Sequence, residues 1–296
     1  MKDRINNKYF KGIIYMLLSS FFFAINDALV KFAVKKIGTD SSLFSVVFFR
    51  AIFTCLLILI LIYFFGNFNL KKIFNDKRAY TRGIFEVMAA FTFLTSLMLM
   101  PIGDVYTLLN TMPLIITAAG AILLKEKVGI RRWSAVFIGF IGVLIVINPI
   151  NLKFGFIFIL PILAAIFFTM RDVVTKGYKD TSNSLEIIFI TSFLVAISFG
   201  LVSLFLPIYI SYESFFYILI ASFALTLAYL FSVLTILNAP LSLTSSIRYS
   251  FIVFGIILGY VLFNEVPSAN MVFGAIVISL SGLFVIRREK KLGKIN

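Results

Sequence analysis

Ten long apolar stretches, separated by short polar segments, follow one another along this chain of 296 residues. Each is close to the roughly 20 helical residues that cross the ~30 Å hydrocarbon core of a bilayer. We therefore expect an all-α integral membrane protein with ten transmembrane helices. The predicted spans are residues 11–33, 43–65, 80–100, 104–124, 131–148, 153–175, 185–206, 214–237, 240–263 and 270–287.

The first span begins in the way a signal peptide does. A basic segment from Lys2 to Lys11 precedes it. The apolar stretch nevertheless continues through Asp27 to Lys31 and contains no cleavage site of the A-x-A kind. We expect a retained first helix.

The composition excludes an ordinary soluble domain and offers little to an enzyme. Apolar residues make up 61% of the chain and charged residues 14%, whereas soluble domains are about half apolar. Histidine, the commonest metal ligand and neutral-pH base, is absent. Walker A, H-E-x-x-H and G-x-S-x-G motifs are absent as well. We expect no enzymatic activity, no cofactor and no metal site.

The positive charges of the chain are unequally distributed between the two sides of the expected membrane. With the N-terminus in the cytoplasm, 20 of the 27 lysines and arginines fall in cytoplasmic segments and four in outer segments. Arg50, Arg171 and Arg248 lie inside spans. This distribution follows the positive-inside rule and predicts that both termini are cytoplasmic. The net charge of +14 is therefore expected to face membrane lipids, and no nucleic-acid partner is expected.

The chain contains an internal repeat. Asp27 and Lys31 recur 145 residues later as Asp172 and Lys176. A proline and a glutamate that bracket the fourth span recur 139 residues later around the ninth: Pro101 and Glu126, then Pro240 and Glu265. A longer connection after the second span accounts for the difference between the two offsets.

This repeat predicts two domains of five helices each, residues 1–150 and 151–296. Because five is odd, the second copy enters the membrane from the opposite side. Inverted repeats of this kind build many secondary transporters, with the substrate site between the two copies.

Short motifs recur along nearly the whole chain: Phe48-Phe49-Arg50, Arg82-Gly83, Pro113, Leu124-Lys125-Glu126-Lys127, Arg132-Trp133, Gly139-Phe140-Ile141-Gly142-Val143, Asn148-Pro149, Arg248-Tyr249, Phe263-Asn264-Glu265-Val266-Pro267 and Gly274-Ala275. They resemble those of the drug/metabolite transporter superfamily, in its EamA-like ten-span branch. The Arg-Tyr pair with the Phe-Asn-Glu-x-Pro ending is also similar to S-adenosylmethionine carriers. The resemblance implies a metabolite carrier with spans four and nine lining the central path.

Charged residues within spans are the first candidates for the substrate site, because a charge at mid-bilayer normally faces a cavity or a partner. Arg50 and Arg248 enter from opposite faces and approach the midplane, where a guanidinium suits a carboxylate or phosphate. The alternative is a structural pairing with Asp27 or Glu86. Glu86 itself is expected either to contact a substrate amine or a coupling proton, or to pair with Arg82 at i−4.

The acid–lysine pattern shared by both copies has two interpretations. Asp27 with Lys31, and Asp172 with Lys176, are expected to form a gate or hinge, or else to anchor helix ends as local pairs. Glu126 is expected to have a structural role at the end of its span, close to Lys125.

Polar and aromatic residues at the centre of spans four, eight and nine complete the candidate site. Asn110 and Tyr249 occupy the same repeat position, and Tyr229 and Tyr249 can stack on a planar or cationic substrate. Pro113 is expected to kink span four, whereas Ile252 stands at the matching place in span nine.

Small residues on spans five and ten predict packing faces and a homodimer seam, for example Gly139 and Gly274. Together these features predict a secondary active transporter of a small polar metabolite in a bacterial inner membrane, working by alternating access. The mixture of Arg and Glu favours a zwitterion such as an amino acid or S-adenosylmethionine. The alternative is a flippase of a lipid-linked phosphate, in which Arg50 and Arg248 bind the phosphate.

Overall fold

A computed structural model describes residues 2–38, 42–65, 74–99, 102–126, 128–147, 155–178, 184–206, 210–263, 266 and 269–291. Within these ranges every regular element is a helix, which confirms the predicted helical class. Pro101, Glu265 and the predicted boundary between the two repeats lie outside the described residues. The elements are α1 (Lys2–Ile37), α2 (Ser42–Phe65), α4 (Lys77–Leu99), α5 (Ile102–Leu109), α6 (Met112–Ile122), α7 (Ile130–Ile147), the 3-10 helix η2 (Gly155–Phe158), α8 (Ile159–Lys176), α9 (Ser184–Ser203), α10 (Tyr212–Asn238), α11 (Leu241–Arg248), α12 (Ser250–Phe263) and α13 (Ala269–Lys291).

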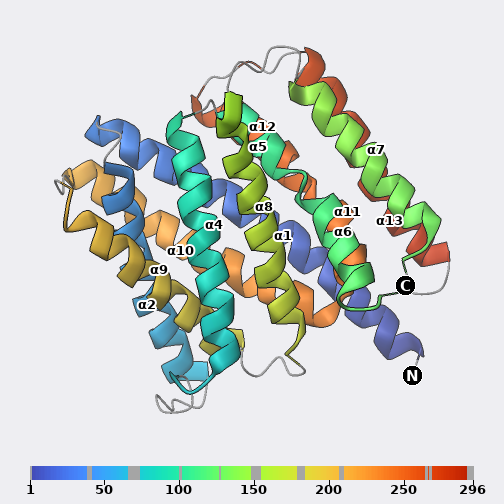
Figure 1. The fold of residues 1–296 in the computed structure, drawn as a ribbon, viewed down its shortest axis with the longest axis horizontal. Helices are drawn as coiled ribbons and strands as arrows, with labels where there is room; N and C mark the ends of the chain where they lie inside the picture. Colours follow the sequence, from blue (N-terminus) through green and yellow to red (C-terminus); the bar gives the residue numbers. More distant parts are fainter. Residues whose placement is uncertain are drawn as a thin grey trace.

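The helices pack mainly with partners that are distant in the sequence. α1 lies along α10, α4 along α8, α2 along α9, and α7 along α13. In Figure 1, α7 and α13 form a pair at one edge of the bundle, and α2 and α9 lie toward the opposite edge. The site described below is lined by residues of α1, α2, α4, α5, α6 and α8–α12, and by none of α7 or α13 in the described part.

Two of the predicted spans are each divided into two helices. Span four consists of α5 and α6, with Asn110 and Thr111 between them. Span nine consists of α11 and α12, and Tyr249 separates them. Pro113 explains the first break because it provides no backbone N–H for the Leu109 carbonyl.

The second break has no proline, and it forms at the position that matches the first. Tyr249 lies 139 residues after Asn110. Here the chain tightens locally, because the Ile252 N–H bonds the Tyr249 carbonyl, three residues back. The sequence had predicted a kink only where proline occurs, and the structure corrects this for span nine.

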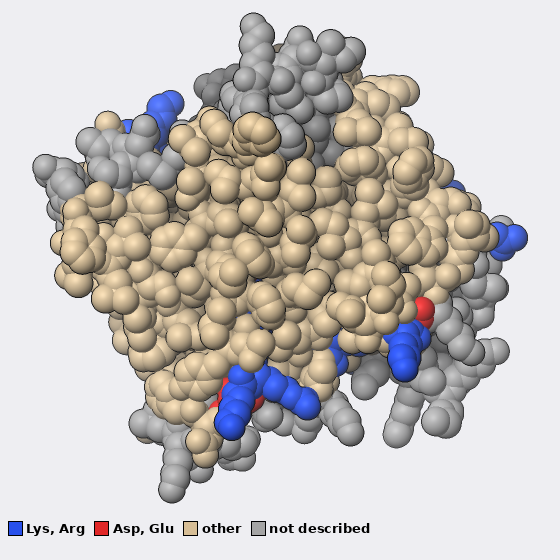
Figure 2. All heavy atoms as spheres, viewed as in Figure 1, with Lys and Arg blue, Asp and Glu red and all other residues tan. Residues whose placement is uncertain are grey.

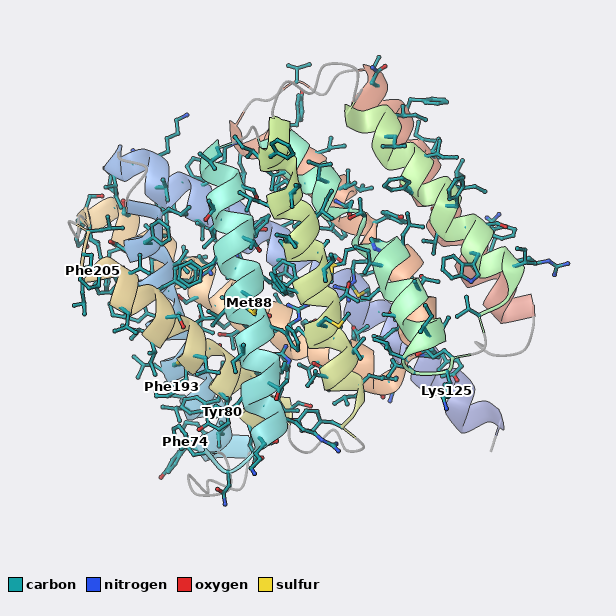
Figure 3. The ribbon with its side chains drawn as sticks, in the orientation of Figure 1. Phe74, Tyr80, Met88, Lys125, Phe193 and Phe205 are labelled. Carbon is teal, nitrogen blue, oxygen red and sulfur yellow. The ribbon has the colours of Figure 1, made fainter. Side chains whose placement is uncertain are left out.

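The outer surface has the character of a membrane protein. Four helices in the described part are long and apolar enough to cross a bilayer: Tyr9–Ile37, Leu43–Phe64, Ser184–Ser203 and Tyr212–Asn238. Figure 2 shows a broad uncharged face, with lysine and arginine gathered mainly along its lower edge and a few at other margins. Large apolar side chains such as Phe205, labelled in Figure 3, and Phe64 are mostly exposed on this surface. The chain is therefore a multi-pass membrane protein.

Glycine allows unusually close helix contacts at two places. A Cβ at residue 12 would lie 2.5 Å from Cβ of Ala239, so α1 and the end of α10 are nearly in backbone contact. A Cβ at residue 139 would lie 2.4 Å from the ring of Tyr249 and 3.0 Å from Oγ of Ser281. The small face around Gly139, expected as part of a dimer seam, therefore packs inside the chain.

Candidate substrate cavity

A cavity of about 560 Å³ lies between the helices of the bundle. Its size falls within the roughly 300–1,000 Å³ typical of small-molecule sites. Lys31, Lys35, Gly38 and Leu43 line its mouth, at the end where α1 finishes and α2 begins. From there the cavity extends inward along α1 as far as Met16.

Asn26 lies between an acid, Asp27, and a cation, Arg50, on one wall of the cavity. Its amide nitrogen donates to Oδ1 of Asp27 at 2.9 Å, and its amide oxygen accepts from Nη1 of Arg50 at 3.2 Å. The Tyr106 hydroxyl donates to Oδ2 of Asp27 at 2.9 Å. Within the described residues neither Asp27 nor Arg50 forms an ion pair, and Nε of Arg50 is buried without a hydrogen-bond partner.

A chain of ion pairs lies beside this group, on α4, α8 and α11. Arg171 contacts Glu86 at 2.7 Å and Asp172 at 2.8 Å. Arg248 then contacts the second oxygen of Asp172 at 2.7 Å. The Tyr229 hydroxyl donates to the remaining oxygen of Glu86 at 2.8 Å. These side chains are almost completely buried, so each charge depends on its neighbours for stabilisation.

Arg82 supports these ion pairs from behind. It is fully buried and lies outside the cavity lining. Its Nε donates to Oγ1 of Thr175 at 2.9 Å, and its Nη1 donates to Oγ1 of Thr191. The local Glu86–Arg82 pair expected from helical spacing is therefore replaced by the Glu86–Arg171 pair. The alternative Asp27–Lys31 pair is likewise not the contact that Asp27 makes, which is with Asn26 and Tyr106.

The cavity lining follows the internal repeat. Offsets of 145 for spans one and two, and 139 for spans three and four, relate seven pairs of residues whose members both line the cavity. The pairs are Phe23 and Phe168, Asn26 and Arg171, Arg50 and Val195, Glu86 and Leu225, Ala90 and Tyr229, Leu109 and Arg248, and Met112 and Phe251. In four of these pairs, a polar or charged residue of one copy corresponds to an apolar residue in the other copy.

The cavity gathers most of the residues predicted for substrate binding. Arg248, Arg50, Glu86, Asn110 and Tyr229 all line it, and so do Asp27 and Lys31 from the predicted gate. Asp172 contributes through its ion pair with Arg248. Lys176 lies beyond the closed end of the cavity, where it contacts α10.

Tyr249 does not line the cavity. It is fully buried, and its hydroxyl donates to the carbonyl of Val136 at 3.1 Å. The ring packs against Gly139 on the side of α7 and α13. This environment favours a packing role over the substrate contact that the sequence suggested.

Replacing Tyr249 with phenylalanine therefore tests which role it has. We expect Tyr249→Phe to leave KM for the transported solute unchanged, and to lower stability by about 1 kcal/mol through loss of one hydrogen bond. Uptake kinetics and thermal unfolding of the purified variant measure the two effects. A large rise in KM would instead return Tyr249 to the binding site.

The end of the bundle opposite the mouth is closed by several contacts. Nζ of Lys176 donates to the carbonyls of Ile236 and Ala239, both at 2.6 Å. Glu126 accepts from the Leu241 N–H at 2.9 Å, which places its carboxylate at the positive N-terminus of α11. Glu126 thus has a partner in the Leu241 N–H, as its expected structural role requires. The sequence had suggested its neighbour Lys125, which is labelled in Figure 3.

A further contact at this end joins the segment before α4 to the segment after α8. The Tyr178 hydroxyl donates to Asp76 at 2.9 Å, and Arg78 donates to the Gly177 carbonyl at 2.9 Å. Burial and the neighbouring Asp76 carboxylate raise the pKa of Tyr178, so it remains a neutral donor over the physiological range.

Three polar residues of the cavity were not among the predicted substrate contacts: Asn26, Tyr106 and Arg171. The sequence had placed Arg171 inside a span, and the repeat relates it to Asn26 by the same offset as the acids that follow them. Tyr106 carries no comparable signal. The described residues contain no group of His, Cys, Asp and Glu side chains suited to a metal ion.

A cavity that holds several charged side chains inside an apolar helical bundle is typical of a membrane transporter. Residues 10–148 match the EamA-like transporter family. This match to the first part of the chain confirms the resemblance that the sequence motifs predicted. Together with the names of the relatives below, it indicates a transporter rather than an enzyme.

Curated relatives resemble the chain over nearly its whole length. The S-adenosylmethionine uptake transporter of Rickettsia prowazekii is 28% identical, and the alignment covers 98% of this chain and 97% of that protein. The riboflavin transporter of Vibrio cholerae is 25% identical, with 95% and 94% covered. A solved structure described only as the crystal structure of a protein has a TM-score of 0.77 at 13% identity, covering 95% of this chain and 98% of that one. That likeness supports the fold.

Proposed function

We propose that this protein is a secondary carrier of a small zwitterionic metabolite, with S-adenosylmethionine as the first candidate. The observation that carries the proposal is the cavity itself, where Asp27 and Arg50 present opposite charges beside aromatic side chains such as Phe23 and Phe251. Aromatic faces suit a planar base and a cationic centre. The names of the Rickettsia relatives supply the candidate.

Ten spans arranged as inverted repeats, residues 1–150 and 151–296, give this carrier its mechanism. The matched breaks at Asn110 and Tyr249, and the repeat-related cavity lining, support this arrangement. Movement of helices around the cavity, both between and within the two copies, would expose it to each side in turn. By the positive-inside rule we expect both termini in the cytoplasm of a bacterium. The mouth beside Lys35 would then open to the outside, which corresponds to an outward-open conformation. A homodimer through spans five and ten stays a prediction.

The function is tested by transport into proteoliposomes. Labelled S-adenosylmethionine, riboflavin and a set of amino acids are offered separately to vesicles with and without the protein. We expect saturable uptake of S-adenosylmethionine, which unlabelled compound inhibits. If none of these solutes enters above the empty-vesicle rate, the proposal is wrong.

A lipid-linked phosphate, offered in the same vesicles, tests the flippase alternative. Its movement without any solute uptake would favour that alternative. We favour the solute carrier because Asp27 and Glu86 line the same cavity as the arginines and would repel a phosphate.

The outward-open orientation makes a separate prediction. Cys55 is the single cysteine and is buried, so Cys55→Ala gives a thiol-free background. In that background we expect Val34→Cys, near the mouth, to react with a membrane-impermeant thiol reagent from outside the cell. Ile236→Cys, fully buried at the closed end, is the control that should not react. Reaction of Val34→Cys only in inside-out vesicles would contradict the orientation.

A further inference from the structure

The matching acids of the two repeat copies, Asp27 and Asp172, have different partners. Asp172 is neutralised by two guanidinium groups, those of Arg171 and Arg248. Asp27, the matching acid of the first copy, accepts hydrogen bonds only from the neutral groups of Asn26 and Tyr106 among the described residues. The first copy therefore retains a carboxylate that still lacks a cation.

A cation, Arg50, lies near Asp27 but does not pair with it directly. Arg50 shares Asn26 with Asp27, because the amide donates to the acid and accepts from the guanidinium. The amide thus separates two opposite charges that would otherwise pair directly. In the second copy Arg171 stands at the place of Asn26 and Val195 at the place of Arg50, so no amide separates Asp172 from a cation there.

Both separated charges have unused hydrogen-bonding capacity. A carboxylate accepts about four hydrogen bonds, and Asp27 receives two from the described residues. A guanidinium has five N–H donors, and Arg50 donates one side-chain bond within them, its Nε remaining buried without a partner. Leaving such groups unsatisfied in a buried site is unfavourable, so a bound ligand is expected to satisfy them.

We propose that Asp27, Asn26 and Arg50 form a clamp for the head group of a free α-amino acid, with the ammonium group on Asp27 and the carboxylate on Arg50. The inference rests on the proposed carrier function and specifies how it selects its substrate. The clamp requires both head-group charges on the same ligand. Glu86, Arg171, Asp172 and Arg248 already neutralise one another and are not part of the clamp.

The clamp is tested by the selectivity of uptake. Labelled S-adenosylmethionine is taken up by proteoliposomes in competition with unlabelled S-adenosylmethionine, its decarboxylated form, or 5′-methylthioadenosine, which lacks the head group. In the wild type we expect decarboxylated S-adenosylmethionine to compete roughly tenfold or more weakly, and methylthioadenosine more weakly still.

The variants should separate the two charges. Arg50→Gln should remove the preference for S-adenosylmethionine over its decarboxylated form, because the carboxylate contact is lost. Asp27→Asn should weaken both competitors by a similar factor and preserve their ratio. Lys36→Gln, in an exposed ion pair with Glu213, is the control and should change neither property.

An unchanged preference in Arg50→Gln would overturn the clamp, as would a wild type that treats the three competitors alike. Either result leaves the carrier function intact, because uptake itself still occurs. Absence of uptake of any labelled solute overturns the proposed function, and the clamp with it. If Arg50→Gln does not fold, the ratio is measured in Arg50→Lys, which keeps the charge but loses the bidentate geometry and should also reduce the preference.

Discussion

Replacing Arg171 with leucine is expected to destabilise the protein by about 3–5 kcal/mol, enough to prevent recovery of folded material at moderate temperature. The variant would leave Glu86 without a cation and Asp172 with only Arg248. Both side chains of the Arg171–Glu86 pair are at most 6% exposed, so water cannot replace the lost partner. The thiol of Cys55 gives the measurement, because this buried cysteine reacts with a thiol-sensitive dye only when the helices separate.

Two comparisons make this expectation specific. Lys36→Ala breaks an ion pair of the same 2.7 Å length, but its side chains are 48% and 63% exposed, so solvent screens the pair and stability should be almost unchanged. The double variant Arg171→Leu with Glu86→Leu removes both charges of the buried pair and should recover part of the loss. Equal effects of the buried and exposed substitutions would show that burial does not control these pairs.

The sequence predicted the helices well because apolar length is a local property. It predicted the break at Pro113 for the same reason, since proline removes a hydrogen bond wherever it occurs in a helix. The break at Tyr249 was missed because no proline marks it. The contact that its ring makes is tertiary, with Gly139 on a helix more than a hundred residues earlier.

The partners of the buried charges were predicted less well. Helical spacing suggested Arg82 for Glu86 and Lys31 for Asp27, because each lies one turn away. The structure instead joins Glu86 to Arg171, on a helix 85 residues away in the sequence. Such pairings depend on which helices face one another. The repeat contained part of this information, since it related Asn26 to Arg171 before any contact was known.

Replacing Lys176 with methionine is expected to shift the protein away from the outward-open conformation proposed above. Nζ of Lys176 bonds the carbonyls of Ile236 and Ala239, at the end of α10, where the helix dipole also favours a cation. Hydrogen bonds to a charged group contribute about 1.5–3 kcal/mol, so their loss would change the ratio of the two conformations by roughly 10- to 150-fold. In the Cys55→Ala background, modification of Val34→Cys from outside should become correspondingly slower.

The repeat supplies the control for this last experiment. Lys31 matches Lys176 and lines the open end of the cavity. If the two copies exchange conformations during transport, Lys31 acts on the end of α4 when the outer side closes, as Lys176 acts on α10 now. Lys31→Met should therefore favour the outward-open conformation and leave the modification of Val34→Cys as fast as before or faster. If both lysine substitutions slow the modification of Val34→Cys, the idea that the two lysines stabilise opposite conformations is wrong. Substitutions at opposite ends of the bundle should change the outward-open population in opposite directions.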